Sequence, residues 1–263
     1  MAAQVTYPIY SLISCSLAFT TKKKLVVFCV SCVCRYDIIL GIGSALLYLH
    51  QDCEQGVLHR DIKPSNVMLD AAFNAKLGDF GLARLVDHGR GAHTTELAGT
   101  MGYMDPDCMI TGRFSTESDM YSFGVVLLEV ACGRRPVVAV PQESAVVHLA
   151  RRVLEMHGRG EVLDAADRRL GGDFDARQME RVLLVGLWCT QQDRSLRPSI
   201  WQANRALRFE ASLPTITNGH EPPPVIGRLA SVPSSSFMSE EDDTATRSMP
   251  ASLGQCPPTN YYT

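Results

Sequence analysis

Residues 59–66 read His-Arg-Asp-Ile-Lys-Pro-Ser-Asn, and residues 79–81 read Asp-Phe-Gly, which begins 13 positions after Asn66. Two more segments with polar residues follow, at residues 99–107 (GTMGYMDPD) and at residues 119–124 (DMYSFG). A lone Asp, Lys or Asn in a loop is usually a turn former or a solvated side chain. In this order and at this spacing, however, the residues indicate one functional site rather than a series of ordinary loops.

These segments carry a resemblance to a known family. Together they resemble the C-terminal lobe of a eukaryotic protein kinase. The stretches RYDIILGIGSALLYLH, AGTMGYMDP, RPSI and LRFEASLP are most similar to plant receptor-like kinases, particularly those with an extracellular legume-lectin domain. The resemblance covers about residues 35–214. It implies a mainly α-helical fold, with a helical bundle around a buried central helix and a small β-hairpin beside the catalytic loop.

The resemblance also implies a Ser/Thr kinase that uses ATP and Mg²⁺ as cofactors. Such an enzyme has little covalent chemistry to perform and must position groups and neutralise charge on the γ-phosphate. Asp61 would accept the substrate hydroxyl proton, and Lys63 would bind the transferring phosphate. Asn66 and Asp79 would bind magnesium, a hard cation that prefers oxygen ligands. Lys63 also favours Ser/Thr specificity, and Thr100 would complete the contact on the substrate side.

Four further residues take structural or regulatory roles under the same resemblance. His59 would order the catalytic loop by hydrogen bonding rather than act as a base. Asp119 would cap the buried helix and hold the backbone of the catalytic loop. Phe80 and Gly81 complete the motif that begins at Asp79.

Arg60 directly precedes the candidate catalytic Asp61, which marks the kinases that are switched by phosphorylation of the activation loop. Residues 87–97 contain Thr94 and Thr95 as candidate phosphate acceptors. A phosphate there would add about two negative charges, which Arg60 could pair with and so order the loop. The alternative, that these are ordinary polar loop residues, stays open.

The activation segment departs from the usual Ala-Pro-Glu ending, because residues 105–107 are Asp-Pro-Asp. In the family the Glu pairs with a buried Arg, for which Arg197 is the matching position. Asp107 keeps the charge on a side chain that is one methylene shorter. We therefore expect a strained or loosened pair between Asp107 and Arg197.

Hydrophobic periodicity predicts the main elements. Apolar residues from Ile38 to Leu49 recur at helical spacing, and residues 120–130 are apolar on every side, as expected for a fully buried helix, which we place at 117–131. Thr116 and Asp119 resemble a helix-capping pair. Further helices are predicted near 144–156, 177–189 and 199–209, and residues 67–69 and 75–77 are predicted to form a small strand pair.

The composition narrows the class of protein. The chain has 263 residues, of which 46% are hydrophobic and 20% charged, enough apolar material for a sizeable core. Its net charge of −3 gives no support to nucleic-acid binding, which usually brings a basic excess. Nine cysteines at irregular spacing favour a reducing compartment over a disulfide framework.

The two ends of the sequence differ from its middle. In residues 1–34, two apolar runs are separated by three lysines at positions 22–24, and neither run reaches the length of a membrane span. We leave this segment unassigned and place the kinase-like lobe at 35–210. Residues 211–263 are rich in Pro, Ser and acidic residues, and we predict a disordered tail.

The given sequence contains no Gly-rich phosphate loop, no strand lysine and no helix glutamate to pair with it, so the N-terminal kinase lobe is missing from it. Two hypotheses therefore stand. The first is an enzyme that phosphorylates protein Ser/Thr side chains, represented by an incomplete chain; the second is an inactive interaction or decoy module that binds substrates or other receptor kinases. The family implies the cytoplasmic side of the plasma membrane, reached only through a longer parent protein, and we expect this chain alone to be soluble and cytoplasmic. A membrane anchor within residues 9–34 is a weaker third option.

Overall fold

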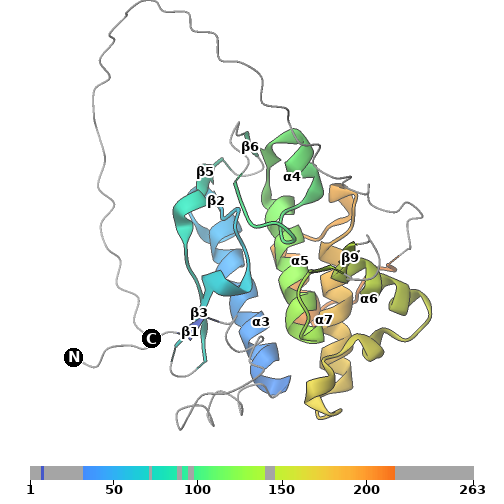
Figure 1. The fold of residues 1–263 in the computed structure, drawn as a ribbon. Coiled ribbons are helices and arrows are strands. Elements are labelled where there is room, and N and C mark those ends of the chain that lie inside the picture. Colours follow the sequence, from blue (N-terminus) through green and yellow to red (C-terminus); the bar gives the residue numbers. More distant parts are fainter. Residues whose placement is uncertain are drawn as a thin grey trace, which may run out of the picture. The chain divides into compact units, whose positions relative to one another are not determined.

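Two tightly packed helices, α5 (Thr116–Cys132) and α7 (Ala176–Cys189), form the centre of the fold in the computed structural model (Figure 1). Every residue of α5 from Ser118 onward is buried except Tyr121, which confirms the prediction of a buried central helix. The two backbones approach closely at two glycines. A Cβ atom on Gly124 would lie 2.6 Å from the Cys189 Cβ, and one on Gly186 would lie 2.7 Å from a Leu128 methyl group.

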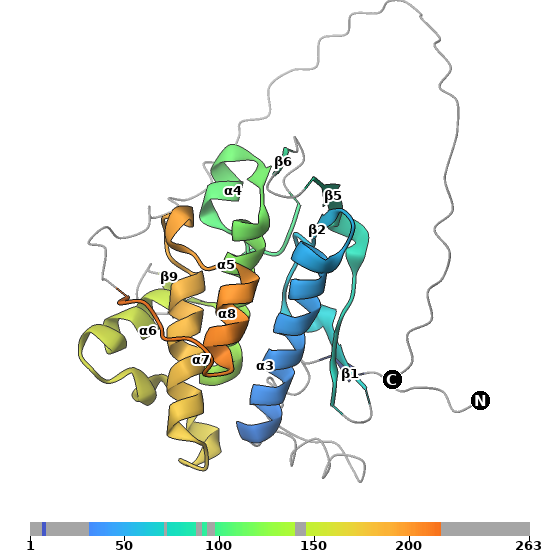
Figure 2. The same cartoon turned by 180° about the vertical axis from the view of Figure 1, so that it is seen from behind.

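The remaining α-helices pack around this pair. They are α3 (Cys32–Leu47), α4 (Pro106–Thr111), α6 (Leu149–Gly158) and α8 (Ile200–Leu207). Helices α3 and α8 contact one another, and α3 and α6 lie on opposite sides of α7 in both views (Figures 1 and 2). The fold is thus mainly α-helical, as predicted. Within the described residues, no helix is long and apolar enough to cross a membrane.

The structure describes residues 7–8, 32–70, 73–87, 91–93, 98–139 and 146–216. Residues 1–221 and 222–263 form separate units, and most of the predicted tail lies outside the described residues.

Short antiparallel strands complete the fold. They are β1 (Tyr7–Pro8), β2 (Gly56–Leu58), β3 (Val67–Leu69), β4 (Ala75–Leu77), β5 (Arg84–Val86), β6 (Ala92–His93), β7 (Arg113–Phe114), β8 (Val137–Ala139) and β9 (Val146–His148). Strand β3 pairs with both β1 and β4, and the other pairs are β2–β5, β6–β7 and β8–β9. The pairing of Val67 with Leu77 confirms the predicted hairpin.

Two local predictions are wrong. The helix predicted near 144–156 begins only at Leu149, because Val146–His148 pairs with Val137–Ala139 as a strand. The N-cap of α5 is Ser115 rather than Thr116, and the Ser115 N–H donates to the Ser118 hydroxyl at 2.6 Å. Strand pairing delays the start of α6 to Leu149, although the apolar spacing extends further toward the N-terminus. At α5, the hydrogen bond between Ser115 and Ser118 places the N-cap one residue earlier than predicted.

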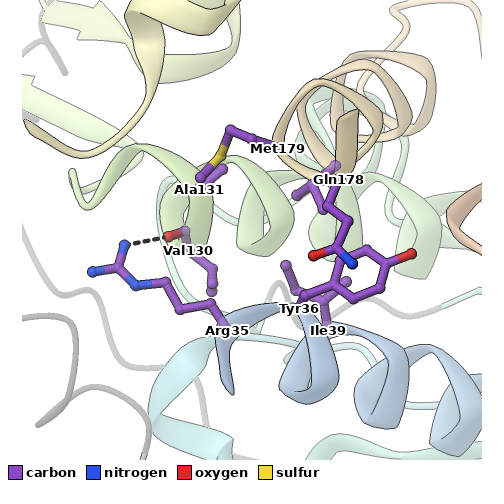
Figure 3. A pocket seen from close by; sticks show the side chains of 8 residues that line it. Arg35, Tyr36, Ile39, Val130, Ala131, Gln178 and Met179 are labelled. Carbon is purple, nitrogen blue, oxygen red and sulfur yellow. Dashed lines mark hydrogen bonds between the residues drawn. The ribbon is translucent and has the colours of Figure 1, made fainter. Parts of the chain in front are cut away.

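The first turns of α3 are fastened to the centre of the fold (Figure 3). The Arg35 guanidinium donates to the Val130 carbonyl at 2.9 Å and to the Asp167 carboxylate at 2.8 Å, and both charged side chains are buried. Next to this tie lies a small apolar hollow between α3, α5 and α7, lined by Ile39 and Met179 among others. The first turns of α3 are therefore held by a buried ion pair as well as by apolar packing.

Candidate active site

The backbone of the catalytic loop is held by the first turn of α5. The Asp119 carboxylate accepts hydrogen bonds from the backbone N–H groups of His59, at 2.8 Å, and Arg60, at 2.9 Å. The His50 ring lies 3.0 Å from the same carboxylate. Arg60 has a left-handed backbone, with φ of 69°, and these two bonds hold the loop in that strained turn. The loop contact expected for Asp119 is present, whereas the helix cap is Ser115.

Four of the candidate residues meet in one hydrogen-bonded cluster, which we call the catalytic cluster: Asp61, Lys63, Asn66 and Thr100. The Lys63 ammonium donates to Asp61 Oδ2 at 2.6 Å and to the Thr100 hydroxyl at 2.8 Å. The Thr100 hydroxyl in turn donates to Asp61 Oδ1 at 2.7 Å. The Asn66 amide nitrogen donates to the Asp61 carbonyl at 2.9 Å and to Asp61 Oδ2 at 3.0 Å.

These contacts fix the charge of Asp61. Burial alone would raise its pKa, but hydrogen bonds from Lys63, Thr100 and Asn66, together with the Lys63 charge, outweigh that effect. The pKa of Asp61 therefore lies below its ordinary value. The side chain is ionised at neutral pH, so it can accept a hydrogen bond from a hydroxyl group and orient it.

The β3–β4 hairpin brings Asp79 next to the catalytic cluster. Because Val67 pairs with Leu77, Asn66 and Gly78 lie opposite each other at the end of the hairpin, and the Gly78 N–H donates to the Asn66 carbonyl at 2.9 Å. His59, which is fully buried, donates from Nε2 to the Gly78 carbonyl at 3.0 Å. This bond couples the catalytic loop to the segment carrying Asp79, as expected for an ordering role of His59.

Asp79 itself is exposed and has a left-handed backbone, with φ of 63°. The Phe80 ring lies beside the His59 ring, with centroids 5.1 Å apart. A Cβ atom on Gly81 would lie 3.4 Å from the Asp79 carboxylate, which is an ordinary contact. The geometry of the Asp-Phe-Gly turn thus rests on His59 and leaves the Asp79 carboxylate accessible.

The chemistry of these side chains fits a magnesium ion bound together with phosphates. The Asn66 amide directs its nitrogen to Asp61, and its oxygen accepts a long hydrogen bond from the Ser65 hydroxyl, at 3.5 Å, which a cation could replace. The Asp79 carboxylate is exposed and could join it. Mg²⁺ is typically held by one or two carboxylates plus substrate phosphates. Among the described residues no group of three or more His, Cys, Asp or Glu side chains could hold a metal ion without such a substrate.

Comparison with known proteins agrees with this geometry. The family model described as "Protein kinase domain" matches residues 20–207. The chain belongs to the protein kinase family. It is 54% identical over 182 residues to the L-type lectin-domain containing receptor kinase IX.1 of Arabidopsis thaliana, covering 68% of this chain and 28% of that protein. It is 46% identical over 212 residues to the L-type lectin-domain containing receptor kinase S.7 of rice (Oryza sativa subsp. japonica), covering 81% of this chain and 29% of that protein.

These relatives confirm the predicted similarity to plant receptor-like kinases of the lectin type. A third, the L-type lectin-domain containing receptor kinase IX.2 of Arabidopsis thaliana, is 49% identical over 189 residues, covering 69% of this chain and 28% of that protein. The chain thus spans less than a third of the length of the curated relatives it matches.

The Arg60 side chain is buried, and only some of its hydrogen-bond donors have a partner. Its guanidinium donates to the Leu82 carbonyl at 3.3 Å and lies 4.3 Å from the centre of the Phe114 ring, and its Nε has no hydrogen-bond partner among the described residues. Burial, and to a smaller degree the nearby Arg84 charge, lower its pKa. Thr94 and Thr95 lie outside the described residues, so their phosphorylation and pairing with Arg60 stay predictions.

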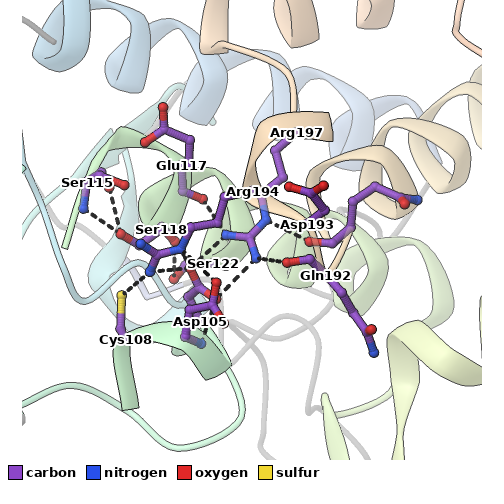
Figure 4. Close-up of polar contacts among 12 residues, drawn as sticks. Asp105, Cys108, Ser115, Glu117, Ser118, Ser122, Gln192, Asp193, Arg194 and Arg197 are labelled. Atoms are coloured by element: carbon purple, nitrogen blue, oxygen red, sulfur yellow. Dashed lines mark hydrogen bonds and ion pairs between the residues drawn. The ribbon is translucent and has the colours of Figure 1, made fainter. Parts of the chain in front are cut away.

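The ion pair predicted between Asp107 and Arg197 is wrong. Arg197 instead binds Asp105 through two nitrogens, at 2.7 and 3.1 Å, and Asp105 is almost fully buried (Figure 4). Arg194 also donates to Asp105, at 3.0 Å, and lies 3.1 Å from the half-exposed Asp107 carboxylate. Asp107 is one methylene shorter than the usual Glu, and Asp105, two residues earlier, occupies the buried position beside Arg197.

Sequence reasoning missed Asp105, Arg194 and the Glu129–Tyr103 pair. A signal for Asp105 was available, because an Asp directly before a Pro is typical of a helix N-cap, and Asp105 caps α4 by accepting from the Asp107 N–H at 3.1 Å. The Tyr103 hydroxyl donates to the buried Glu129 carboxylate at 2.5 Å. No local pattern predicts that contact, because the two residues meet only through the tertiary fold.

Proposed function

We propose that this chain carries the catalytic-loop half of a Ser/Thr protein kinase active site, which transfers the γ-phosphoryl group of ATP to a protein hydroxyl. The catalytic cluster carries this proposal. In it, ionised Asp61 has two oxygens held by neighbours on the same loop and by Thr100. A carboxylate fixed in this way can orient a substrate hydroxyl for in-line attack and accept its proton.

The other residues of the cluster have complementary tasks. Lys63 would place its positive charge against the transferring phosphate, since its ammonium group is held in the cluster beside Asp61. Asn66 and Asp79 would hold Mg²⁺, which neutralises charge on the phosphates when bound. Thr100 bridges Lys63 and Asp61 on the side where the hydroxyl would enter.

The preference for serine and threonine rests on Lys63, since tyrosine kinases usually carry Ala or Arg near this position. Protein substrates, and association with other receptor kinases, follow from the family alone. We infer that any attachment to the cytoplasmic side of the plasma membrane operates through a longer parent protein. Phosphorylation of Thr94 or Thr95, paired with Arg60, remains the proposed switch.

We expect little or no phosphoryl transfer from the 263-residue chain on its own. Its sequence contains no Gly-rich loop, strand lysine or helix glutamate, and kinases need these groups to align the phosphates of ATP. The test is therefore a fusion in which the upstream kinase segment of the receptor kinase IX.1 precedes Arg35. Transfer from ATP to serine, threonine and tyrosine peptides is then measured with the chain alone as the reference.

The variants decide the outcome. Asp61→Asn and Asp79→Asn should reduce transfer by the fusion to background, whereas Asp173→Asn, an exposed aspartate far from the catalytic cluster in the sequence, should leave it unchanged. A folded fusion without activity, or one unaffected by Asp61→Asn, would overturn the proposal. Phosphorylation of the tyrosine peptide alone would overturn the Ser/Thr preference.

A second candidate function is an interaction module that binds proteins without catalysis. The observation in its favour is a set of exposed apolar side chains close to the catalytic loop: Met68 is 36% exposed, Phe80 48% and Leu85 68%. Contiguous exposed apolar surface often marks a binding site. The test is an immunoblot of the native protein with an antibody against residues 211–263, which gives its apparent molecular mass. A mass matching 263 residues would favour the module, and a much larger mass would favour the enzyme.

A further inference from the structure

Three arginines line one hollow on the side of the fold formed by the end of α5, by α6 and by two short 3₁₀ turns. Arg134 follows α5, Arg152 lies in the first turn of α6, and Arg168 lies in the turn Arg168–Leu170. The hollow is shallow and open to solvent, and we call it the arginine hollow. Asp164 is the one acidic residue among the described residues that line it, so the hollow has a net positive charge.

We propose that the arginine hollow is a binding site for a phosphorylated side chain on a protein partner. The first argument is the contrast between these arginines and their neighbours. Arg151, next to Arg152, lies 3.3 Å from the Glu155 carboxylate, and Arg159 donates to Glu161 at 3.0 Å. The three arginines of the hollow have no hydrogen-bonding or ion-pair partner among the described residues.

The surroundings of these arginines strengthen the argument. The floor of the hollow is apolar and buried, with Val153 at 0%, Cys132 at 2% and Leu149 at 5% exposure. An anion seated on such a floor is partly shielded from water, so its attraction to nearby cations is stronger than on a flat surface. Arginine is also the side chain best suited to bind phosphate, because its planar donor group can make two parallel hydrogen bonds.

The position of Arg152 gives a third reason. It lies in the first turn of α6, where the helix dipole favours negative rather than positive charge. That turn holds no acidic side chain, and its N-cap, His148, makes no capping hydrogen bond. A bound phosphate would relieve both unfavourable features at once, because it would pair with Arg152 and lie near the positive end of the helix.

The chemistry favours a phosphorylated protein segment over a membrane surface. A phosphorylated side chain carries about two negative charges in one group, which suits several guanidinium groups around one hollow. A membrane-binding face combines basic residues with exposed apolar side chains that enter the lipid. Among the described residues, no exposed large apolar side chain lines the hollow.

The proposal can be tested on the full 263-residue chain without phosphoryl transfer, so its result is independent of the function proposed above. The probe is a fluorescein-labelled peptide, Gly-Ser-Gly-phosphothreonine-Gly-Ser-Gly, compared by fluorescence anisotropy with its unphosphorylated twin and with an aspartate version. We expect the phosphopeptide to bind about tenfold more tightly than either. Arg134→Ala, Arg152→Ala and Arg168→Ala should each weaken its binding about threefold to tenfold.

The matched control is Arg151→Ala, which removes an exposed arginine from the same helix but not from the hollow, and it should leave affinity unchanged. Circular dichroism melting checks that each variant is folded. Equal binding of the three peptides, or equal losses for Arg151→Ala and Arg152→Ala, would overturn the proposal. It would also be overturned if vesicles containing a phosphoinositide bound more tightly than the phosphopeptide and lost binding with the same three variants.

Discussion

Different interactions stabilise the catalytic side and the helical centre of this protein. The catalytic side, residues 56–86, consists of three-residue strands and turns joined by hydrogen bonds, and its apolar side chains at Met68, Phe80 and Leu85 are exposed. In the helical centre, formed by α5 and α7, nearly all of α5 from Ser118 onward is buried, and α7 buries its apolar face. The two regions meet where Asp119, at the start of α5, binds the backbone at residues 59 and 60.

This difference indicates how stability and chemistry are divided. Apolar burial in the helical centre supplies most of the favourable free energy of folding. The catalytic side also buries a few apolar side chains, such as Ile62 and Val67, but its polar residues depend on the centre for their position. Substitutions in the centre should therefore change stability most, and substitutions of exposed or polar side chains on the catalytic side should change charge and chemistry with less change in stability.

The largest expected effect comes from Phe123, which is fully buried in α5. Phe123→Ala leaves a cavity and should lower the free energy of unfolding by about 3–5 kcal/mol. Phe80→Ala, on the catalytic side, should lower it by less than about 1 kcal/mol, because Phe80 is half-exposed. Urea unfolding followed by circular dichroism measures both. Equal losses would show that the two regions do not differ in the way described.

Next comes the ion pair that anchors the end of the activation segment. Asp105→Ala leaves the buried Arg197 without its carboxylate and should destabilise the fold by about 3–5 kcal/mol. Asp107→Ala removes a half-exposed partner of Arg194 and should cost less than about 1 kcal/mol. Thermal melting of the two variants ranks them. The reverse order would restore Asp107 as the partner of Arg197.

Glu129 provides a pH test of the helical centre. Burial raises the pKa of this glutamate to about 7, with its hydrogen bond from Tyr103 acting in the opposite direction. The folded state therefore keeps a proton between about pH 4.5 and 7 that the unfolded state releases, so stability falls as pH rises through this range.

The loss should be on the order of 3 kcal/mol, measured by urea unfolding at pH 5 and pH 8. Glu129→Gln should remove this part of the pH dependence. A wild-type chain whose stability does not change between these pH values would contradict the raised pKa.

A small change in stability is expected in the catalytic cluster, where the main effect is on a pKa. Thr100→Val removes a hydrogen bond that lowers the pKa of Asp61, so that pKa should rise, while stability should fall by only about 0.5–1.5 kcal/mol. Carboxyl NMR titration measures the pKa, and urea unfolding measures stability. Thr111→Val, whose hydroxyl bonds to a backbone carbonyl in α4, should leave Asp61 unchanged. A large loss of stability with no change in pKa would place Thr100 in the core rather than in the site.

Much of the helical centre could be predicted from the sequence, because burial leaves a periodic pattern. The spacing from Ile38 to Leu49 and the apolar run from 120 to 130 correspond to α3 and α5. The strand pair β2–β5 was not predicted, because three-residue strands carry too little pattern and their partners lie far along the chain. Val146 appeared to belong to a helix because it shares helical spacing with Leu149 and Val153, although it pairs as a strand with the nearby Ala139.

Most of the catalytic cluster was predictable because its motif residues lie close together in sequence, from Asp61 to Asn66, whereas Thr100 was predicted only through the family resemblance. The anchor of the activation segment was not, because two aspartates lie on either side of Pro106 and both are candidates for Arg197. Only the solvent exposure of the two side chains distinguishes them, because Asp105 is buried and Asp107 is about half-exposed. Sequence motifs thus predicted the cluster, and the structure was needed to determine which aspartate pairs with Arg197.

The contact between α3 and α8 has a consequence for synthesis of the protein. Asn204 in α8 donates to the Gly43 carbonyl in α3 at 2.9 Å, across a separation of 161 residues. At ribosomal rates of about 5–20 residues per second, α3 waits roughly ten to thirty seconds for this partner. During that interval its apolar face, including Ile42 and Leu46, lacks its final cover. The α3–α8 contact can therefore form only after residue 204 has been synthesised, so it belongs to a late stage of folding on the ribosome.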